Sequence, residues 1–233
     1  MNGRNSQLAR HYDALWQDAV DYFAIGKVAL DPFLIDRRRD HRLGLTVIAR
    51  PTQQVVDQFS ALIHELTQIE PHQHFYQPSE LHITILSLFT ATEEVEPYFA
   101  KIPSYLTALD PVLSAAERFT ISFRGITASK SSIIAQGFPQ DGSLECLRER
   151  LREALRSQNL GEGLDARYRI TTAHTTIMRF QTQPLDLKRL IKILGGYREY
   201  DFGQSAFQTV QLVKNDWYMS ADKMEVLADY PLL

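Results

Sequence analysis

The chain contains two similar stretches, Leu81-His82-Ile83-Thr84-Ile85-Leu86 and Ala173-His174-Thr175-Thr176-Ile177-Met178. Each is rich in β-branched and apolar residues and carries a histidine followed two positions later by a threonine, which is typical of a strand. Because residues i and i+2 of a strand share one face, each strand should present an imidazole beside a hydroxyl. We therefore expect two strands, one in each half of the chain, whose polar pairs face each other across a groove.

Helical and strand-like segments surround these two stretches without strict βαβ alternation. This mixture predicts an α+β fold with largely antiparallel sheets. Expected helices cover residues 8–23, 52–69, a stretch from about 92 that Pro103 should break, 144–155 and 184–194. Expected strands cover residues 43–49, 74–77, 81–89, 119–123, 132–136, 168–179, 210–214 and 224–228. Ser6, Ser143 and the pair Gly195-Gly196 are the expected helix caps.

The first 41 residues form a separate N-terminal segment in this interpretation. An amphipathic stripe from Leu8 to Phe23 predicts a helix, and Asp36-Arg37-Arg38-Arg39-Asp40 reads as a solvated loop. We expect residues 1–41 to be a helical extension and residues 42–233 to be one bilobal domain. The two halves of that domain have no Gly/Ser-rich linker between them.

Composition excludes several classes of protein. The chain has 233 residues, of which 44% are hydrophobic and 23% charged, so it is not a disordered, collagen-like or coiled-coil chain. Its net charge of −3 disfavours a long polyanion as partner and leaves a small or terminal phosphate open. The single cysteine, Cys146, excludes an internal disulfide. Without an apolar run of about 20 residues, we expect a cytoplasmic protein with no membrane contact and no obligate protein partner.

Two imidazoles and two hydroxyls suit phosphoester cleavage by a general acid and a general base. Histidine has a reference pKa near 6.5, so both protonation states are accessible near neutral pH. The threonine hydroxyls could donate to phosphate oxygens. Arg179 is a candidate phosphate contact, but strand alternation places it on the face opposite His174. A bend after Ile177 or a reach around the strand end would be needed, and a surface arginine is the alternative.

Other interpretations of these residues stay open. Each motif histidine could be a core residue satisfied by a neighbouring hydroxyl. His72 and His74 could bind a metal together with His82, although this group lacks a carboxylate cluster and an ordinary turn is the simpler interpretation. Tyr76 and Phe89 could stack on a base or pack in the core. No glycine-rich nucleotide-binding motif is present, and we expect neither a cofactor nor a metal.

The paired His-x-Thr strands resemble those of the 2H phosphoesterase superfamily, which contains 2′–5′ RNA ligase-like proteins and cyclic nucleotide phosphodiesterases. The resemblance includes the lead-in Tyr76-Gln77-Pro78-Ser79-Glu80-Leu81-His82 and Arg179 after the second motif. It extends to a terminal hairpin formed by Leu212-Val213-Lys214 and Met224-Glu225-Val226-Leu227, and covers residues 42–230. Ala173 departs from the proline that many members carry before the second histidine.

This resemblance implies a bilobal fold in which two pseudo-symmetric sheets flank a central groove, with helices outside. It also implies metal-independent hydrolysis of a 2′,3′-cyclic phosphate or a 2′-linked phosphodiester on a nucleotide or RNA end. His82 and His174 would be the acid–base pair and Thr84 and Thr176 would hold the phosphate, with Arg179 and Tyr76 as further substrate contacts. A non-catalytic binder of terminal phosphates is the alternative.

Overall fold

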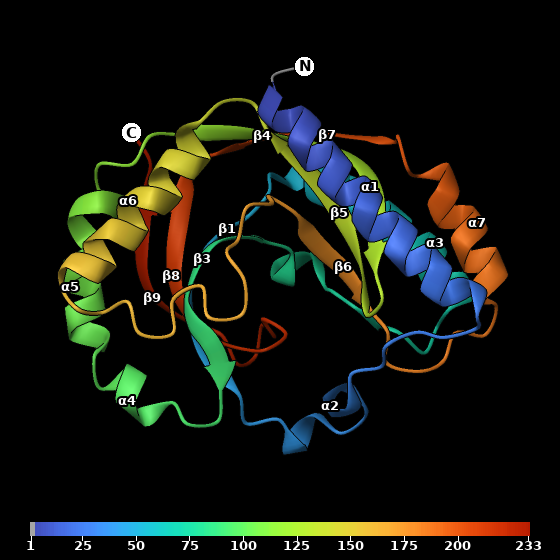
Figure 1. The fold of residues 1–233 in the computed structure, drawn as a ribbon, viewed down its shortest axis with the longest axis horizontal. Helices are drawn as coiled ribbons and strands as arrows, with labels where there is room; N and C mark the ends of the chain where they lie inside the picture. Colours follow the sequence, from blue (N-terminus) through green and yellow to red (C-terminus); the bar gives the residue numbers. More distant parts are fainter. Residues whose placement is uncertain (1–2) are drawn as a thin grey trace.

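The computed structural model describes residues 3–233 and shows two antiparallel sheets with helices on their outer sides (Figure 1). One sheet has four strands in the order β3-β1-β8-β9, and the other has five in the order β2-β6-β5-β4-β7. The strands are β1 Leu43–Ala49, β2 His74–Phe75, β3 Ile83–Thr92, β4 Phe119–Ser129, β5 Ser132–Pro139, β6 Thr175–Arg179, β7 Asp201–Phe207, β8 Thr209–Asp216 and β9 Glu225–Pro231. The expected α+β architecture is confirmed.

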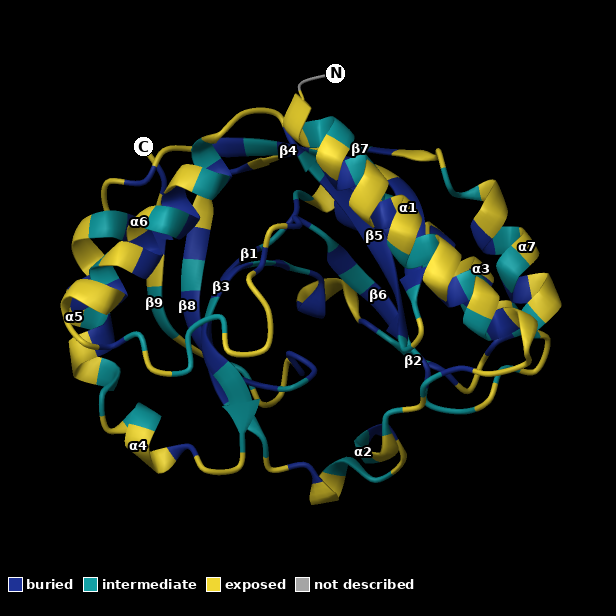
Figure 2. Ribbon diagram, in the orientation of Figure 1, coloured by how far each residue is buried: buried dark blue, intermediate teal, exposed yellow. Residues whose placement is uncertain are grey.

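Helices cover the outer flank of each sheet. The helices are α1 Gly3–Ala24, α2 Pro32–Ile35, α3 Gln53–Ile69, α4 Glu96–Phe99, α5 Ile102–Leu113, α6 Ser143–Ser157 and α7 Leu187–Gly196. Helices α5 and α6 pack on each other, and α6 contacts β3 of the four-stranded sheet. Helices α1 and α3 contact strands of the five-stranded sheet. Figure 2 shows the buried residues concentrated on the sheets and on the inward helix faces, which is how amphipathic helices cover a sheet.

The leucine stripe of α6 illustrates this packing. Leu144, Leu147, Leu151 and Leu155 recur at helical spacing, and all four are buried in the main core. The same face also carries Arg148 and Arg152, whose side chains are 1% and 0% exposed. Two fully buried arginines on an otherwise apolar face need specific partners, because an unpaired buried charge is strongly destabilising.

Several expected elements need correction. Strand β6 begins only at Thr175 rather than near residue 168, and β3 continues to Thr92, where a helix was expected. Strand β7 was not predicted, because Asp201–Phe207 contains glycine and polar residues that disguise its alternation. Gly142, not Ser143, caps α6, and Gly195-Gly196 belongs to α7 rather than following it.

The N-terminal helix packs directly on the five-stranded sheet. The Tyr12 hydroxyl donates to the Gly137 carbonyl at 3.2 Å, and the Thr127 hydroxyl donates to the Tyr12 carbonyl at 2.8 Å. The helix begins at Gly3, so Ser6 lies inside it and does not cap it. The first two residues of the expected 1–41 extension lie outside the described part, and the division into extension and domain stays a prediction. Within residues 3–233, no helix combines the length and the apolar character needed to cross a bilayer.

Candidate active site

Six side chains singled out from the sequence line one pocket between the two sheets. His82 directly precedes β3 and His174 directly precedes β6, so the two motifs occupy equivalent places in the two halves. Strand β3 is the edge of its sheet, and only the two-residue strand β2 lies beyond β6. The pocket is lined by His82, Thr84, His174, Thr176, Arg179 and Tyr76, together with residues of β1, β8 and the segment 163–170.

The alternation expected along both motif strands is confirmed. His82 and Thr84 are half-buried and reach the pocket, whereas Ile83 is fully buried on the other face. His174 and Thr176 likewise reach the pocket. The period-2 geometry of a strand therefore places both imidazole–hydroxyl pairs in one space.

A capped turn presents His82 to the pocket. Pro78 opens a 3-10 helix, and the Glu80 carboxylate accepts a hydrogen bond from the backbone N–H of Gln77 at 2.9 Å. Proline at the first position and a carboxylate that returns to the cap stabilise such a turn. The turn directs the Glu80 carbonyl toward the imidazole, where it lies 2.6 Å from Nδ1 of His82.

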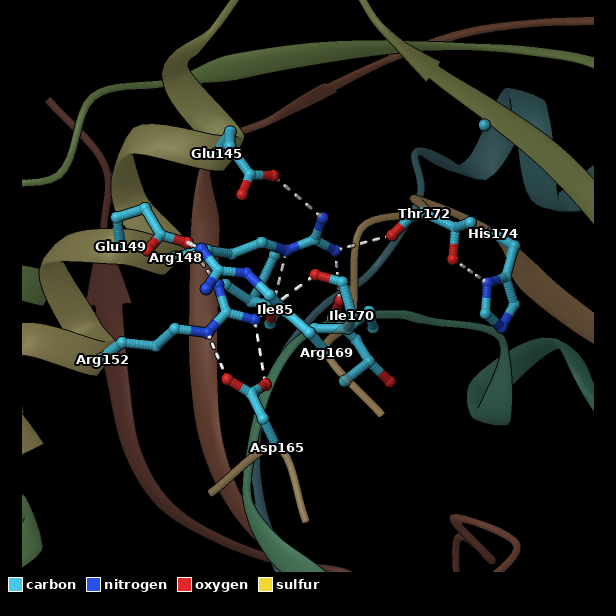
Figure 3. A network of polar contacts seen from close by, with 12 residues as sticks. Ile85, Glu145, Arg148, Glu149, Arg152, Asp165, Arg169, Ile170, Thr172 and His174 are labelled. Carbon is cyan, nitrogen blue, oxygen red and sulfur yellow. Dashed lines mark hydrogen bonds and ion pairs between the residues drawn. The ribbon is translucent and has the colours of Figure 1, made fainter. Parts of the chain in front are cut away.

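A different contact holds the second histidine. The Thr172 hydroxyl lies 2.7 Å from Nδ1 of His174 (Figure 3). Between these two residues, the Ala173 carbonyl approaches β5 so closely that a Cβ on Gly137 would overlap it. Only glycine accommodates this close backbone approach, which fixes the chain immediately before His174.

These two contacts give the histidines different proton preferences. A carbonyl only accepts, so neutral His82 carries its proton on Nδ1 and leaves Nε2 unprotonated. A hydroxyl both donates and accepts, so His174 fits either tautomer. Neither Nε2 has a hydrogen-bond partner within residues 3–233. The sequence left the acid and base roles open, whereas this geometry distinguishes the two rings.

Burial favours the neutral form of both histidines near neutral pH. Burial lowers the pKa of His82 to about 4, and Arg50 and Arg179 add to the effect while the Glu80 carbonyl opposes it. Burial also lowers the pKa of His174 to about 4, with further contributions from His82, Arg148 and Arg179. Cationic neighbours and loss of water both disfavour an imidazolium. A bound phosphate would add negative charge and reverse part of this effect.

A β-bulge brings Arg179 to the pocket. Ile133 pairs with Met178 but Ile134 pairs with Thr176, so Ile177 is an extra residue in β6. An extra residue shifts the alternation by one position, which places Arg179 on the same side as Thr176. Of the two routes by which Arg179 could reach the pocket, the structure shows the irregularity at Ile177.

The Tyr76 hydroxyl accepts a hydrogen bond from Nε of Arg179 at 2.8 Å. This contact fixes the plane of the guanidinium, whose two terminal nitrogens make no hydrogen bond within residues 3–233 and can therefore contact a ligand. Tyr76 is 2% exposed, so its ring packs in the core while its hydroxyl orients the arginine.

The possible metal site of His72, His74 and His82 is not supported. Within residues 3–233, no three histidine, cysteine, aspartate or glutamate side chains are grouped to hold a metal ion. His72 is exposed, whereas Nη2 of Arg37 lies 3.2 Å from Nδ1 and 3.1 Å from Nε2 of His74. Burial, Arg37 and Arg179 lower the pKa of His74 to about 3, so the ring packs as a neutral partner of arginine.

Sequence reasoning missed several residues at the pocket. Trp217, which no sequence motif singles out, lines the pocket with Arg167, and the Arg167 guanidinium lies 4.9 Å from the centre of its ring. Phe89 lines the pocket too, but it is 2% exposed and stacks on Tyr98 at 4.0 Å, so packing is its main role. Thr172 was recognisable, because it lies two residues before His174 and a strand-like backbone shares a face at that spacing.

Comparison with known proteins identifies the family. A family model described as the 2'-5' RNA ligase superfamily matches residues 55–216. The chain belongs to this superfamily. The match includes both His-x-Thr motifs and confirms the resemblance drawn from them. A search among curated proteins found no match.

Solved structures of similar fold agree with this membership of the 2'-5' RNA ligase superfamily. TT0787 of Thermus thermophilus superposes with a TM-score of 0.61 at 15% identity, covering 81% of this chain and 97% of that one. E. coli LigT complexed with 3'-AMP superposes with a TM-score of 0.55 at 13% identity, covering 82% of this chain and 98% of LigT. At such identities the likeness shows the shared fold.

Proposed function

We propose that this protein is a metal-independent phosphodiesterase that hydrolyses a 2′,3′-cyclic phosphate or a 2′-linked phosphodiester of a nucleotide or RNA end. The observation that carries the proposal is the pair of neutral histidines in one pocket, each hydrogen-bonded at Nδ1 and each without a hydrogen-bond partner at Nε2 within residues 3–233. Beside them, two threonine hydroxyls and the half-buried Arg179 can donate hydrogen bonds to the phosphate oxygens, on which negative charge builds in the transition state.

The two Nδ1 contacts favour His82 as base and His174 as acid. In its neutral form, His82 has an unprotonated Nε2, which takes a proton from water as the water oxygen attacks phosphorus. The bond from phosphorus to the ribose oxygen breaks, and Nε2 of His174 gives that oxygen a proton. The acid is the imidazolium form of His174, whose Nδ1–H donates to the Thr172 hydroxyl while its Nε2–H faces the leaving oxygen. Loss of the Nε2 proton then returns a neutral ring.

The remaining pocket residues would bind the phosphate. Thr84 and Thr176 would donate hydroxyl hydrogen bonds to its non-bridging oxygens. Arg179, oriented by Tyr76, would supply a guanidinium fork that matches oxyanion geometry. The negative charge of the phosphate would raise the pKa of His174 and so favour the protonated acid.

Similar structures support a nucleotide as substrate. E. coli LigT has been crystallised with ATP, NADP+ and 3'-AMP. In this chain, Trp217 and Arg167 at the pocket provide an aromatic ring and a cation, the side chains that contact bases and phosphates.

Phosphorus NMR tests the proposal with EDTA present. The substrates are the four nucleoside 2′,3′-cyclic phosphates and a short RNA ending in a cyclic phosphate, with His82→Ala as control. We expect conversion to a 2′- or 3′-monophosphate, lost in the variant. Binding of these compounds without turnover would favour the phosphate binder instead, and loss of activity with EDTA would contradict metal independence.

A further inference from the structure

A single buried arginine of α6 contacts the backbones of both motif segments. The Arg148 side chain is 1% exposed, and its Nε donates to the carbonyl of Ile85 at 2.9 Å. Its Nη2 donates to the carbonyl of Thr84 at 2.9 Å and to the carbonyl of Thr172 at 2.8 Å. One guanidinium therefore joins the first His-x-Thr strand to the segment that carries the second histidine (Figure 3).

The first motif strand is shaped to accept this arginine. Strand β3 is an edge strand, so one row of its backbone groups has no partner strand. Successive carbonyls of a regular strand point to opposite sides, yet those of Thr84 and Ile85 both reach Arg148. The pairing of β3 with β1 shifts by one residue at this point, between Leu86 and Thr84, which makes Ile85 a bulge residue. The bulge explains how two consecutive carbonyls share one guanidinium.

The contact to the second motif continues directly to a histidine. Arg148 holds the backbone of Thr172, and the side chain of Thr172 contacts Nδ1 of His174 at 2.7 Å. The other contact holds the backbone of Thr84, whose hydroxyl lines the pocket. The guanidinium thus fixes Thr84 in one half of the molecule relative to Thr172 in the other half, and through Thr172 relative to His174.

Stability alone accounts poorly for this arrangement. Burial lowers the pKa of Arg148 to about 10, so the side chain stays charged at neutral pH. Its acidic neighbour is Glu145, whose Oε2 lies 3.9 Å from Nη1 of Arg148. Arg152 is a second buried cation one helical turn away. Arg152 has its own carboxylate partner, because Nε donates to Asp165 at 2.8 Å. A buried charge satisfied mainly by carbonyls is costly compared with an apolar side chain.

We propose that Arg148 is a positioning residue that sets the separation and orientation of the two His-x-Thr pairs. This inference rests on the proposed function, since it assigns Arg148 a role in the reaction of that pocket. Arg148 does not line the pocket; it acts through the backbones of Thr84 and Thr172.

Arg148→Met tests the role with readouts besides turnover. Methionine fills much of the space but donates no hydrogen bond, so the two motif backbones lose their tie. We expect kcat for cyclic phosphate hydrolysis to fall about 10- to 100-fold, the cost of misplaced catalytic groups, with KM changed less. Because the positive charge near His174 is also removed, histidine NMR titration should show a higher pKa for that ring, and affinity for inorganic phosphate should fall.

Arg152→Met is the matched control. It removes a second buried guanidinium from the same helix face, whose partners are Asp165, Glu149 and the Ile170 carbonyl. We expect a similar loss of Tm without the change in His174 titration. Equal effects of the two substitutions on kcat, titration and phosphate affinity would overturn the proposal and leave Arg148 a purely structural residue.

Arg148→Lys keeps the proposal testable if the methionine variant does not fold. Lysine retains the charge but cannot span three carbonyls in the planar geometry of guanidinium. We expect a folded protein with reduced kcat and reduced phosphate affinity, and wild-type values for both would overturn the proposal. NMR titration and phosphate binding need no turnover, so an inactive wild type would refute the proposed function while the positioning role remained measurable.

Discussion

The Thr172 hydroxyl lies 2.7 Å from Nδ1 of His174, whereas the neighbouring Thr175 hydroxyl is buried with no hydrogen-bond partner within residues 3–233. Two threonines on either side of the same histidine therefore occupy opposite situations. One hydroxyl controls the imidazole, and the other contributes an unsatisfied polar atom to the core. Replacing each threonine in turn with valine, which has nearly the same shape, therefore compares the loss of a hydrogen-bonded hydroxyl with the loss of an unsatisfied one.

Thr172→Val should lower kcat about 3- to 10-fold, the effect of one lost hydrogen bond that orients a reacting group. Thr175→Val should leave kcat unchanged and keep or raise Tm, because it replaces an unsatisfied hydroxyl with a methyl. Steady-state kinetics and thermal melts of both variants test this. Equal kinetics for the two would show that the Thr172 contact does not orient His174.

His82→Ala and His174→Ala should each lower the hydrolysis rate by about 10²–10⁴-fold while the protein stays folded. A diester with a p-nitrophenolate leaving group separates the roles, because that group leaves without a proton. On this substrate, we expect His174→Ala to regain much of the wild-type rate. We expect His82→Ala to remain slow, because the attacking water still needs a base. The reverse pattern would exchange the acid and base assignments.

The pH profiles of kcat/KM and kcat should differ. The free-enzyme profile, kcat/KM, reports histidines with pKa values near 4, so it should fall as pH rises above about 5. The kcat profile should peak at higher pH, because bound phosphate favours the imidazolium. Steady-state rates from pH 4 to 8 test this. Two coincident profiles centred near pH 6.5 would contradict the burial effect on the histidines.

Stability should fall as pH decreases from about 6.5 to 4. Burial lowers the folded-state pKa values of His74, His82 and His174 far below the reference of 6.5. In that window the unfolded chain binds more protons than the folded protein, so acid favours unfolding. Thermal melts across this range measure the slope. His74→Gln should reduce the slope, and a slope equal to wild type in this variant would contradict the lowered pKa of His74.

Tyr76→Phe should raise KM about 3- to 10-fold with little change in kcat. It removes the acceptor for Nε of Arg179 and loosens the guanidinium that we propose binds the phosphate. Arg179→Lys should have a larger effect on KM, because an ammonium cannot form two parallel contacts. Phosphate affinity by calorimetry tests both variants, and unchanged affinity in Arg179→Lys would remove this residue from the site.

The pocket was predictable from the sequence where strand alternation was regular. His82 and Thr84 share a face because they are two residues apart, and His174 and Thr176 follow the same rule. Arg179 does not follow this rule, because the extra residue Ile177 moves it to the opposite face of the strand. An isoleucine is an ordinary strand residue, so the sequence does not indicate a bulge there. Strand β6 was predicted too long because the residues before Thr175 include apolar side chains. These side chains line the pocket or pack in the core, but their backbone does not pair with another strand.

The sequence by itself determined the fold class, the family and the four motif residues of the pocket, because residue type and period-2 spacing are local properties. Only the tertiary structure decided which imidazole faces a carbonyl and which faces a hydroxyl. It alone brought Arg148 to both motif segments, from sequence separations of 63 and 24 residues. Such contacts depend on how distant segments pack and on where a bulge turns a backbone, and no local pattern encodes either.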